Sequence, residues 1–234
     1  MAAATTTRTV LVTGASRGIG LKFVDLYAQD GWNVIGAARD PSEAEQLKAL
    51  SPYKIVQLDV SNEESILRAA KELEGEAIDL LINNASIFSN NGSATTPKLD
   101  MTQQFEINAV GPFLVTREFV PNLKAAAAAR GTATVAQITS GLSSITNNSP
   151  EGYFGYRASK AGLNMVTASL AADLKSDGII AATLSPGFVA TDMNRHAGAV
   201  TTTASVSGLM AAIAGLSLER SGVFLNYDGQ PLPW

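Results

Sequence analysis

The sequence contains no cysteine and only one histidine, His196, in 234 residues. Without cysteine the chain has no disulfide framework, and zinc or iron–sulfur sites built on thiolates are excluded. No second histidine or nearby carboxylate cluster accompanies His196, so we expect no metal site. We interpret His196 as a solvated loop residue, with a contact to substrate as the alternative.

Long apolar stretches are also missing. The longest, such as residues 208–216, fall well short of the roughly 20 residues that span a bilayer. Residues 1–7 lack the basic start and apolar core of a secretory signal, so we expect a flexible tail there. These absences predict a cytoplasmic protein with no membrane partner.

Charge is sparse as well. Charged residues make up 16% of the chain, whereas about 25% is usual. The net charge of −4 gives no overall attraction to nucleic acid or to anionic membranes. The hydrophobic fraction of 46% excludes global disorder. The low charge therefore indicates surface that is hidden, for example against another subunit.

Two hydrophobic periods alternate along the chain. The period of two predicts strands at 9–13, 33–38, 53–58, 78–82, 132–139, 179–184 and 223–226. The helical period predicts helices from residue 19 to 30, and at 41–50, 61–73, 101–130, 153–175 and 203–218. This alternation favours one α/β domain over residues 1–234, a doubly wound Rossmann-like fold of seven parallel strands with helices on both faces.

Three local signals refine these helices. Asp40 before Pro41 is expected to cap the second helix, and Ser61 with Glu64 forms a capping-box pattern for the third. The long fourth helix is expected to bend near its prolines, Pro112 and Pro121.

Ligands of such sheets bind at the carboxyl ends of the strands. After the first strand, residues 13–20 read Thr-Gly-Ala-Ser-Arg-Gly-Ile-Gly. Glycines there let the backbone turn tightly and approach a pyrophosphate closely, at the start of a helix whose N–H groups attract its charge. The turn therefore favours nucleotide binding, although tight packing alone is the alternative.

Further motifs follow the later strands in order. Asp59-Val60 follows the third strand and Asn83-Asn84-Ala85 the fourth, and Asn108 lies in the long helix. Ser140 follows the fifth strand, Tyr156 and Lys160 begin the next helix, and Pro186-Gly187 follows the sixth strand. Each motif is common alone. Together with the glycine turn, they make the chain resemble the short-chain dehydrogenase/reductases, and residues 222–234 are similar to the end of the C-factor and sniffer-type carbonyl reductases.

The resemblance implies a catalytic set of Asn108, Ser140, Tyr156 and Lys160. Tyr156 and Lys160, four residues apart on one helix face, would be the general acid and the cation that lowers its pKa and bonds the nicotinamide ribose. Ser140 would donate a hydrogen bond to the substrate oxygen, and Asn108 would hold a water. The wide spacing from Ser140 to Tyr156 keeps Ser143 and Ser144 as rival serines, and Tyr153 is a weaker rival tyrosine.

The resemblance also implies an NADPH/NADP+ site. Arg17 and Arg39 suit the 2′-phosphate, Asp40 is interpreted as a helix cap, and Asp59 either meets the adenine or caps the next helix. The cofactor residues are then Gly14, Ser16, Arg17, Gly18, Ile19, Gly20, Arg39, Asp59, Val60, Asn84, Ala85, Tyr156, Lys160, Pro186, Gly187, Val189 and Thr191.

The expected substrate is a small hydrophobic ketone or aldehyde, under a loop at 188–200. Its pocket would comprise Phe88, Leu142, Phe154, Phe188 and Met193, although core packing is the alternative for each, and Ser86 would add a hydroxyl where the family has glycine. A regulatory or signalling module that binds NADP(H) with little turnover, and a 3-oxoacyl-type ketoreductase, are the alternative functions. The helices at 113–129 and 163–174, rich in Ala and Leu, correspond to a family interface and predict a homodimer or homotetramer.

Overall fold

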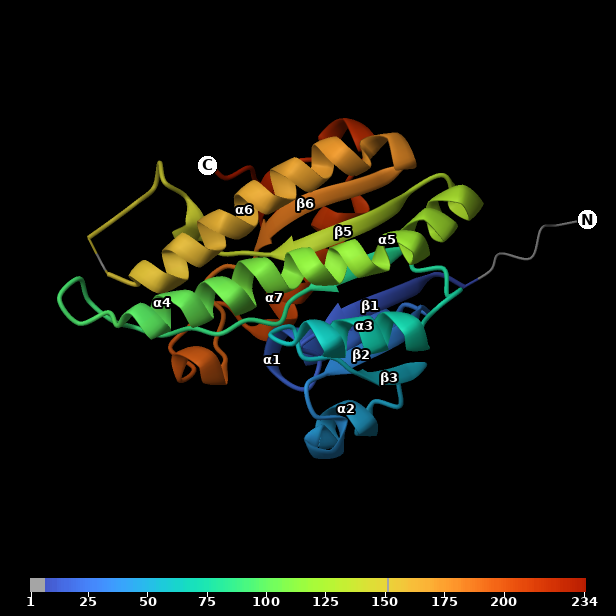
Figure 1. Ribbon diagram of the computed structural model, residues 1–234, viewed down its shortest axis with the longest axis horizontal. Helices are drawn as coiled ribbons and strands as arrows, with labels where there is room; N and C mark the ends of the chain where they lie inside the picture. The colour runs from blue at the N-terminus through green and yellow to red at the C-terminus, as the bar shows by residue number, and fades with distance from the viewer. Residues whose placement is uncertain (1–6, 151) are drawn as a thin grey trace, which may run out of the picture.

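The computed structural model describes residues 7–150 and 152–234, so most of the expected tail at 1–7 lies outside the described residues. Within these ranges seven parallel strands form one sheet in the order β3-β2-β1-β4-β5-β6-β7 (Figure 1). The strands are β1 (Thr9–Thr13), β2 (Asn33–Ala38), β3 (Lys54–Gln57), β4 (Leu80–Asn83), β5 (Ala133–Ile138), β6 (Ile179–Ser185) and β7 (Phe224–Asn226). The predicted doubly wound α/β fold is confirmed.

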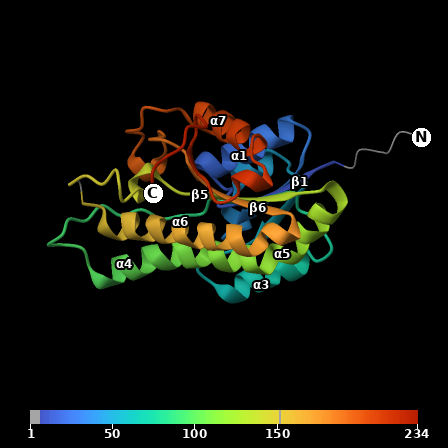
Figure 2. The same cartoon turned by 90° about the horizontal axis from the view of Figure 1, so that it is seen from above.

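Helices cover both faces of the sheet. They are α1 (Gly18–Gln29), α2 (Glu45–Ala49), α3 (Glu63–Glu72), α4 (Lys98–Phe105), α5 (Gly111–Arg130), α6 (Phe154–Leu174) and α7 (Thr202–Ala214). Figure 2 shows α1 and α7 on one side and α3, α4, α5 and α6 on the other. All residues of β1 and β6 are buried, as expected for parallel strands covered on two faces.

Each face has its own apolar core. Phe119 and Leu123 of α5 pack with Ile66 of α3 on one face. Phe23 of α1, Leu47 of α2 and residues of α7 such as Leu209 pack on the other face. Because β1 contributes Leu11 to the first cluster and Val10 to the second, its alternate side chains join the two layers.

The long helix expected at 101–130 is broken up differently from the prediction. It begins at Lys98, and a π-helical segment, Glu106–Val110, separates α4 from α5. Pro112 lies in the first turn of α5, where its missing N–H is tolerated, while α5 continues through Pro121. The π-helical segment carries Asn108. Its wider turn accommodates Pro112 at the start of α5.

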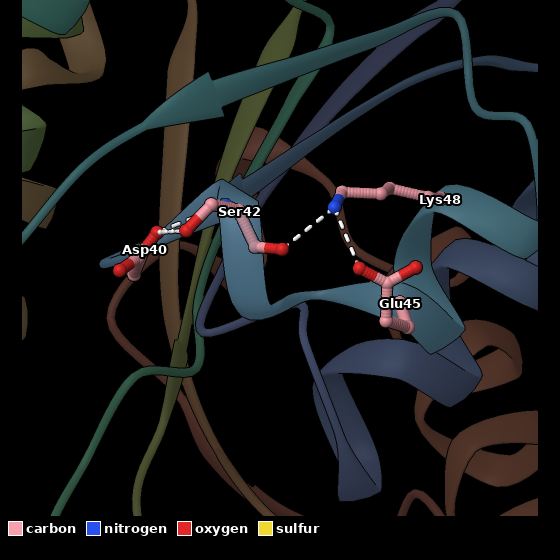
Figure 3. Close-up of polar contacts among 4 residues, drawn as sticks. All are labelled: Asp40, Ser42, Glu45 and Lys48. Atoms are coloured by element: carbon pink, nitrogen blue, oxygen red, sulfur yellow. Dashed lines mark hydrogen bonds and ion pairs between the residues drawn. The ribbon is translucent and has the colours of Figure 1, made fainter.

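Two capping predictions have different outcomes. The Asp40 carboxylate accepts hydrogen bonds from the Ser42 amide (2.8 Å) and hydroxyl (2.5 Å), but it caps only a short 3₁₀ turn, Pro41–Glu43, before α2 begins at Glu45 (Figure 3). The predicted cap at Ser61 is wrong. Asn62 caps α3 by accepting from the Ser65 amide at 3.0 Å.

A candidate active-site cleft

The loops that follow the strands enclose one large cleft, with a cavity volume of about 960 Å³. Most of the sequence-predicted cofactor and catalytic residues line it: Gly14, Ser16, Arg17, Gly18, Ile19, Arg39, Asp59, Val60, Asn84, Ala85, Ser140, Tyr156, Lys160, Pro186, Gly187, Val189 and Thr191. Gly20 and Asn108 do not line it. The fold therefore brings residues from six strand ends to one place.

The glycine turn is packed tightly against the loop after β4. Gly14 has φ +64°, and a Cβ there would lie 2.8 Å from Cα of Ala85. The Asn84 side-chain amide donates hydrogen bonds to the main-chain oxygens of Thr13 (3.0 Å) and Gly14 (3.2 Å). Gly20 serves packing, because a Cβ there would lie 2.2 Å from the oxygen of Gly14. Close packing of the turn is confirmed for Gly14 and Gly20, while Gly14 and Gly18 also line the cleft, so nucleotide binding by the turn stays a prediction.

Two cations border the cleft beside this turn. Arg17 and Arg39 are exposed cleft residues. Asp40 is not a lining residue, and its hydrogen bonds to Ser42 hold the pKa of its carboxyl below the usual range (Figure 3). Asp59 lines the cleft, and its carboxylate accepts from the Ser61 amide (3.0 Å) and hydroxyl (2.7 Å) in the turn before α3. Its interpretation as a cap of the next helix is wrong, because Asn62 caps α3. The rim after β1 and β2 is therefore cationic.

Tyr156, Ser140 and Lys160 lie together on the opposite wall. The Ser140 side chain lies close enough to Tyr156 to lower its pKa slightly, and Nζ of Lys160 lies 5.9 Å from the Tyr156 ring centroid. Lys160 is 2% exposed and donates to the Ile138 main-chain oxygen at 2.8 Å. These residues come from the end of β5 and one face of α6, as the spacing of four predicts.

Burial dominates the electrostatics of this wall. Burial raises the pKa of Tyr156 to about 12, against a smaller lowering by the nearby Ser140 side chain. Burial lowers the pKa of Lys160 to about 7. The expected lowering of the Tyr156 pKa by Lys160 is thus not found in the protein alone, because desolvation disfavours the charged form of both groups. Near neutral pH, Tyr156 keeps its proton and Lys160 titrates.

Of the three candidate serines, Ser140 is the one that lines the cleft. The Ser143 hydroxyl donates to the Ser140 main-chain oxygen at 2.6 Å and accepts from the side-chain amide of Asn164 at 2.8 Å. Ser144 accepts from the Asn147 amide at 3.1 Å. Ser143 and Ser144 are therefore buried, and they stabilise the loop after β5 instead of lining the cleft. Tyr153 does line the cleft, at the start of α6.

Asn108 supports the cleft through hydrogen bonds without lining it. Its side-chain amide donates to the Ile87 main-chain oxygen (2.9 Å) and the Ser159 hydroxyl (3.0 Å), and its oxygen accepts from the Ile87 amide (2.9 Å). The side chain is fully buried, and both its donor hydrogens are used within the protein. Its expected role in holding a water stays a prediction.

The apolar part of the cleft holds four of the five predicted substrate residues, namely Phe88, Leu142, Phe188 and Met193. The Phe88 ring packs edge-on against Tyr156 with centroids 5.0 Å apart. The prediction is wrong for Phe154, which lines a second hollow of about 740 Å³. Positions two apart on a helix do not share a face, so Phe154 cannot join Tyr156 on the cleft side of α6.

Some lining residues escaped prediction. Ser86 lines the cleft as its position suggested, but Asn226 and Leu232 enter from the far end of the chain. An Asp228-Gly229 turn signal was visible in the sequence, without indicating where the returning chain would run. His196 does not line the cleft and lies, exposed, 3.0 Å from the Asp192 carboxylate, as expected for a solvated loop residue.

Comparison with known proteins agrees with this geometry. The sequence pattern described as short chain dehydrogenase matches residues 8–201. The chain belongs to the short-chain dehydrogenase family. C-signal of Myxococcus xanthus is 38% identical over 67% of this chain and 93% of its own length. An oxidoreductase of Schizosaccharomyces pombe, itself uncharacterised, is 31% identical over 98% of this chain and 99% of its own length.

Solved structures of carbonyl reductases share the whole fold. The NADPH-bound carbonyl reductase from chicken fatty liver superposes with a TM-score of 0.91 at 36% identity, covering 97% of this chain and 99% of that one. Carbonyl reductase Sniffer of Drosophila melanogaster gives 0.93 at 29% identity, covering 97% and 100%. These neighbours place the chain among carbonyl-reductase structures of the family.

Two other features of this short-chain dehydrogenase concern the described residues alone. None of the helices in residues 7–150 and 152–234 has the length and apolarity to cross a membrane. Over the same part of the chain, no group of three or more His, Asp or Glu side chains gathers in a way that could hold a metal ion.

Proposed function

We propose that this short-chain dehydrogenase is an NADPH-dependent reductase that converts a hydrophobic ketone or aldehyde to an alcohol. The observation that carries the proposal is the meeting of Ser140, Tyr156 and Lys160 on one wall of a cleft lined by Phe88 and Leu142. A polar proton donor beside an apolar wall suits a carbonyl group on an apolar body.

The residues of the cleft fit a dinucleotide phosphate. The turn before α1 gives the close backbone approach that a pyrophosphate needs, and a Cβ on Gly18 would meet only Cγ2 of Thr191, at 3.9 Å, so this side of the turn is open. Arg17 and Arg39 offer the two guanidinium groups that a 2′-phosphate favours, while the Asp40 carboxylate is engaged by Ser42. The bound NADPH of the chicken carbonyl reductase supports this assignment.

When bound, the nicotinamide supplies the hydride, and the protein's own groups handle the proton. Tyr156 donates its phenolic proton to the carbonyl oxygen, and burial keeps that proton in place at neutral pH by raising the pKa of Tyr156 to about 12. The Ser140 hydroxyl, which lines the cleft together with Tyr156, donates to the same developing oxyanion. Lys160 holds the ribose and, when charged, stabilises the phenolate left after donation.

Assay of NADPH oxidation tests this proposal. The wild-type protein is given ketones, aldehydes, quinones and a 3-oxoacyl thioester, with NADH as the matched cofactor control and NADPH binding followed by fluorescence. We expect turnover of hydrophobic ketones or aldehydes with NADPH preferred. Binding of NADPH without turnover of any carbonyl would instead favour a regulatory or signalling module, and turnover of the thioester alone a 3-oxoacyl-type ketoreductase.

We also propose that two copies of the chain pair through α5 and α6. Both helices lie on the outer layer of the molecule (Figure 2), where Phe113 on α5 is 38% exposed and Met165 on α6 is 69% exposed. Exposed apolar side chains on neighbouring helices are typical of a subunit interface. Light scattering is expected to give at least twice the mass of one chain, and a monomeric mass at micromolar concentration would refute the pairing.

A further inference from the structure

The segment 230–234 returns to the cleft from the edge of the sheet. After β7 the chain turns at Asp228, whose carboxylate accepts from the Gln230 amide at 3.1 Å. The Asn226 amide then donates to the Gln230 oxygen, and the Leu232 amide to the Phe224 oxygen, each at 2.8 Å. The segment therefore runs antiparallel along β7, an edge strand, with its path fixed by main-chain hydrogen bonds.

Leu232 is the side chain that this path brings to the cleft. It lines the same cavity as Leu142, Phe188 and Met193. These other three residues belong to the loops after β5 and β6, so Leu232 adds an apolar wall from a third loop. No motif of the chain assigns it a role.

The segment also holds the loop that carries Ser140. The main-chain oxygen of Trp234 accepts from the Thr146 amide at 2.9 Å and from the Thr146 hydroxyl at 2.7 Å. The Trp234 ring packs against Phe224 with centroids 5.3 Å apart, and Phe224 is buried in β7. Figures 1 and 2 both show the end of the chain beside this loop.

The contact between Trp234 and Thr146 is connected to Ser140 by a short series of main-chain hydrogen bonds. The loop from Ser140 to Thr146 closes on itself, because the Ser143 amide donates to the Ser140 oxygen (3.0 Å) and the Ser144 amide to the Gly141 oxygen (3.2 Å). A loop held at Thr146 and at the end of β5 keeps Ser140 on the same cleft wall as Tyr156. Displacement of such a group by about 1 Å is enough to slow catalysis strongly.

We propose that segment 230–234 is part of the substrate site, with Leu232 as a specificity-determining wall and Trp234 as a positioning residue for Ser140. The proposal rests on the proposed carbonyl reduction. It predicts two separable effects, one on the choice of substrate and one on the rate of the chemical step.

The first experiment compares Leu232→Ala with Leu67→Ala, a matched change on the exposed face of α3. The substrates are an aryl ketone and the small 2,3-butanedione. Leu232→Ala is expected to raise KM for the aryl ketone about tenfold, with kcat and 2,3-butanedione kinetics within about twofold of wild type. Equal kinetics of Leu232→Ala and wild type on both carbonyls would overturn the role of Leu232.

The second experiment compares Trp234→Ala with the conservative Trp234→Phe. Loss of the ring is expected to lower kcat about tenfold while KM and NADPH affinity stay within about twofold, and phenylalanine is expected to restore the rate. A parallel loss of NADPH affinity, or no rescue by phenylalanine, would make Trp234 merely structural and refute its positioning role. If the wild type itself reduces no carbonyl, the proposed function fails instead, so the two failures are distinguishable.

Discussion

The two halves of the cleft are built in different ways. The half beside β1, β2 and β4, called here the backbone half, is built on closely packed main chain and bordered by the Arg17 and Arg39 side chains. Gly14 packs closely on Ala85, and Asn84 is hydrogen-bonded to the turn. The half beside β5 and β6 consists of side chains from separate loops, including Phe188, which is 59% exposed, and Leu232. The first half tolerates little change and suits one constant ligand, whereas the second can vary with the substrate.

Removal of Lys160 is expected to have the largest effect on activity, since its amine lines the cleft 5.9 Å from the Tyr156 ring centroid. Lys160→Met should lower kcat/KM by about a thousandfold, because the phenolate of Tyr156 and the ribose both lose their partner. Steady-state assay checks this, with Lys175→Met, at an exposed position after α6, as the matched control. A loss below about tenfold would contradict the assigned role.

The same variant should be more stable than the wild type. In the folded protein the pKa of Lys160 is about 7, well below the ordinary lysine value of 10.5. Between these values the unfolded chain binds more protons, so this contribution to stability is fully present above pH 10.5 and is lost as the pH falls toward 7. Lys160→Met should raise the Tm by about 4 °C at pH 7, with the difference shrinking toward pH 10. A difference independent of pH would argue against a neutralised buried amine.

Arg39→Ala should have the next largest effect, which should be limited to cofactor binding in the backbone half of the cleft. Loss of one bidentate contact to the 2′-phosphate is expected to weaken NADPH binding by about thirtyfold while NADH binding stays nearly constant. Fluorescence titration with both cofactors measures this. Arg68→Ala, on the exposed face of α3, is the control. An unchanged preference in Arg39→Ala would place cofactor discrimination elsewhere.

Substitution of Phe88 or Phe154 should change KM least, and it tests which of the two rings belongs to the substrate side of the cleft. Phe88 packs on Tyr156 inside the cleft, whereas Phe154 lines the other hollow. Phe88→Ala is expected to raise KM for an aryl ketone about fivefold, since burial of an aromatic ring in the pocket is lost. Phe154→Ala, the matched control, should leave KM unchanged. The reverse pattern would restore Phe154 to the substrate pocket.

The sequence predicts the backbone half well because its signals are local. The Asn84 side-chain amide donates to the Gly14 main-chain oxygen where two strands end, and strand ends follow from the alternating pattern alone. The spacing of Tyr156 and Lys160 likewise determines a shared helix face. For Tyr156 and Lys160 the spacing alone contains the physical requirement, whereas Gly14 and Asn84 meet because β1 pairs with β4.

The side-chain half could not be predicted as fully because it depends on contacts between distant segments. Leu232 reaches the cleft through a hairpin along β7, and Phe154 leaves it because of the phase of α6. The cap of α3 at Asn62 and the π segment at Asn108 depend on one-residue shifts that periodicity does not resolve. The direction of the Tyr156 pKa shift required the depth of burial, which is a tertiary property.

The central claim is that Tyr156 delivers the proton to a carbonyl oxygen in this cleft. Its most direct test is the rate of NADPH oxidation with a hydrophobic ketone for wild type, Tyr156→Phe and the control Tyr153→Phe, with NADPH affinity measured in the same samples. We predict a loss of about a thousandfold for Tyr156→Phe alone, at unchanged affinity. Full activity of Tyr156→Phe would contradict the account.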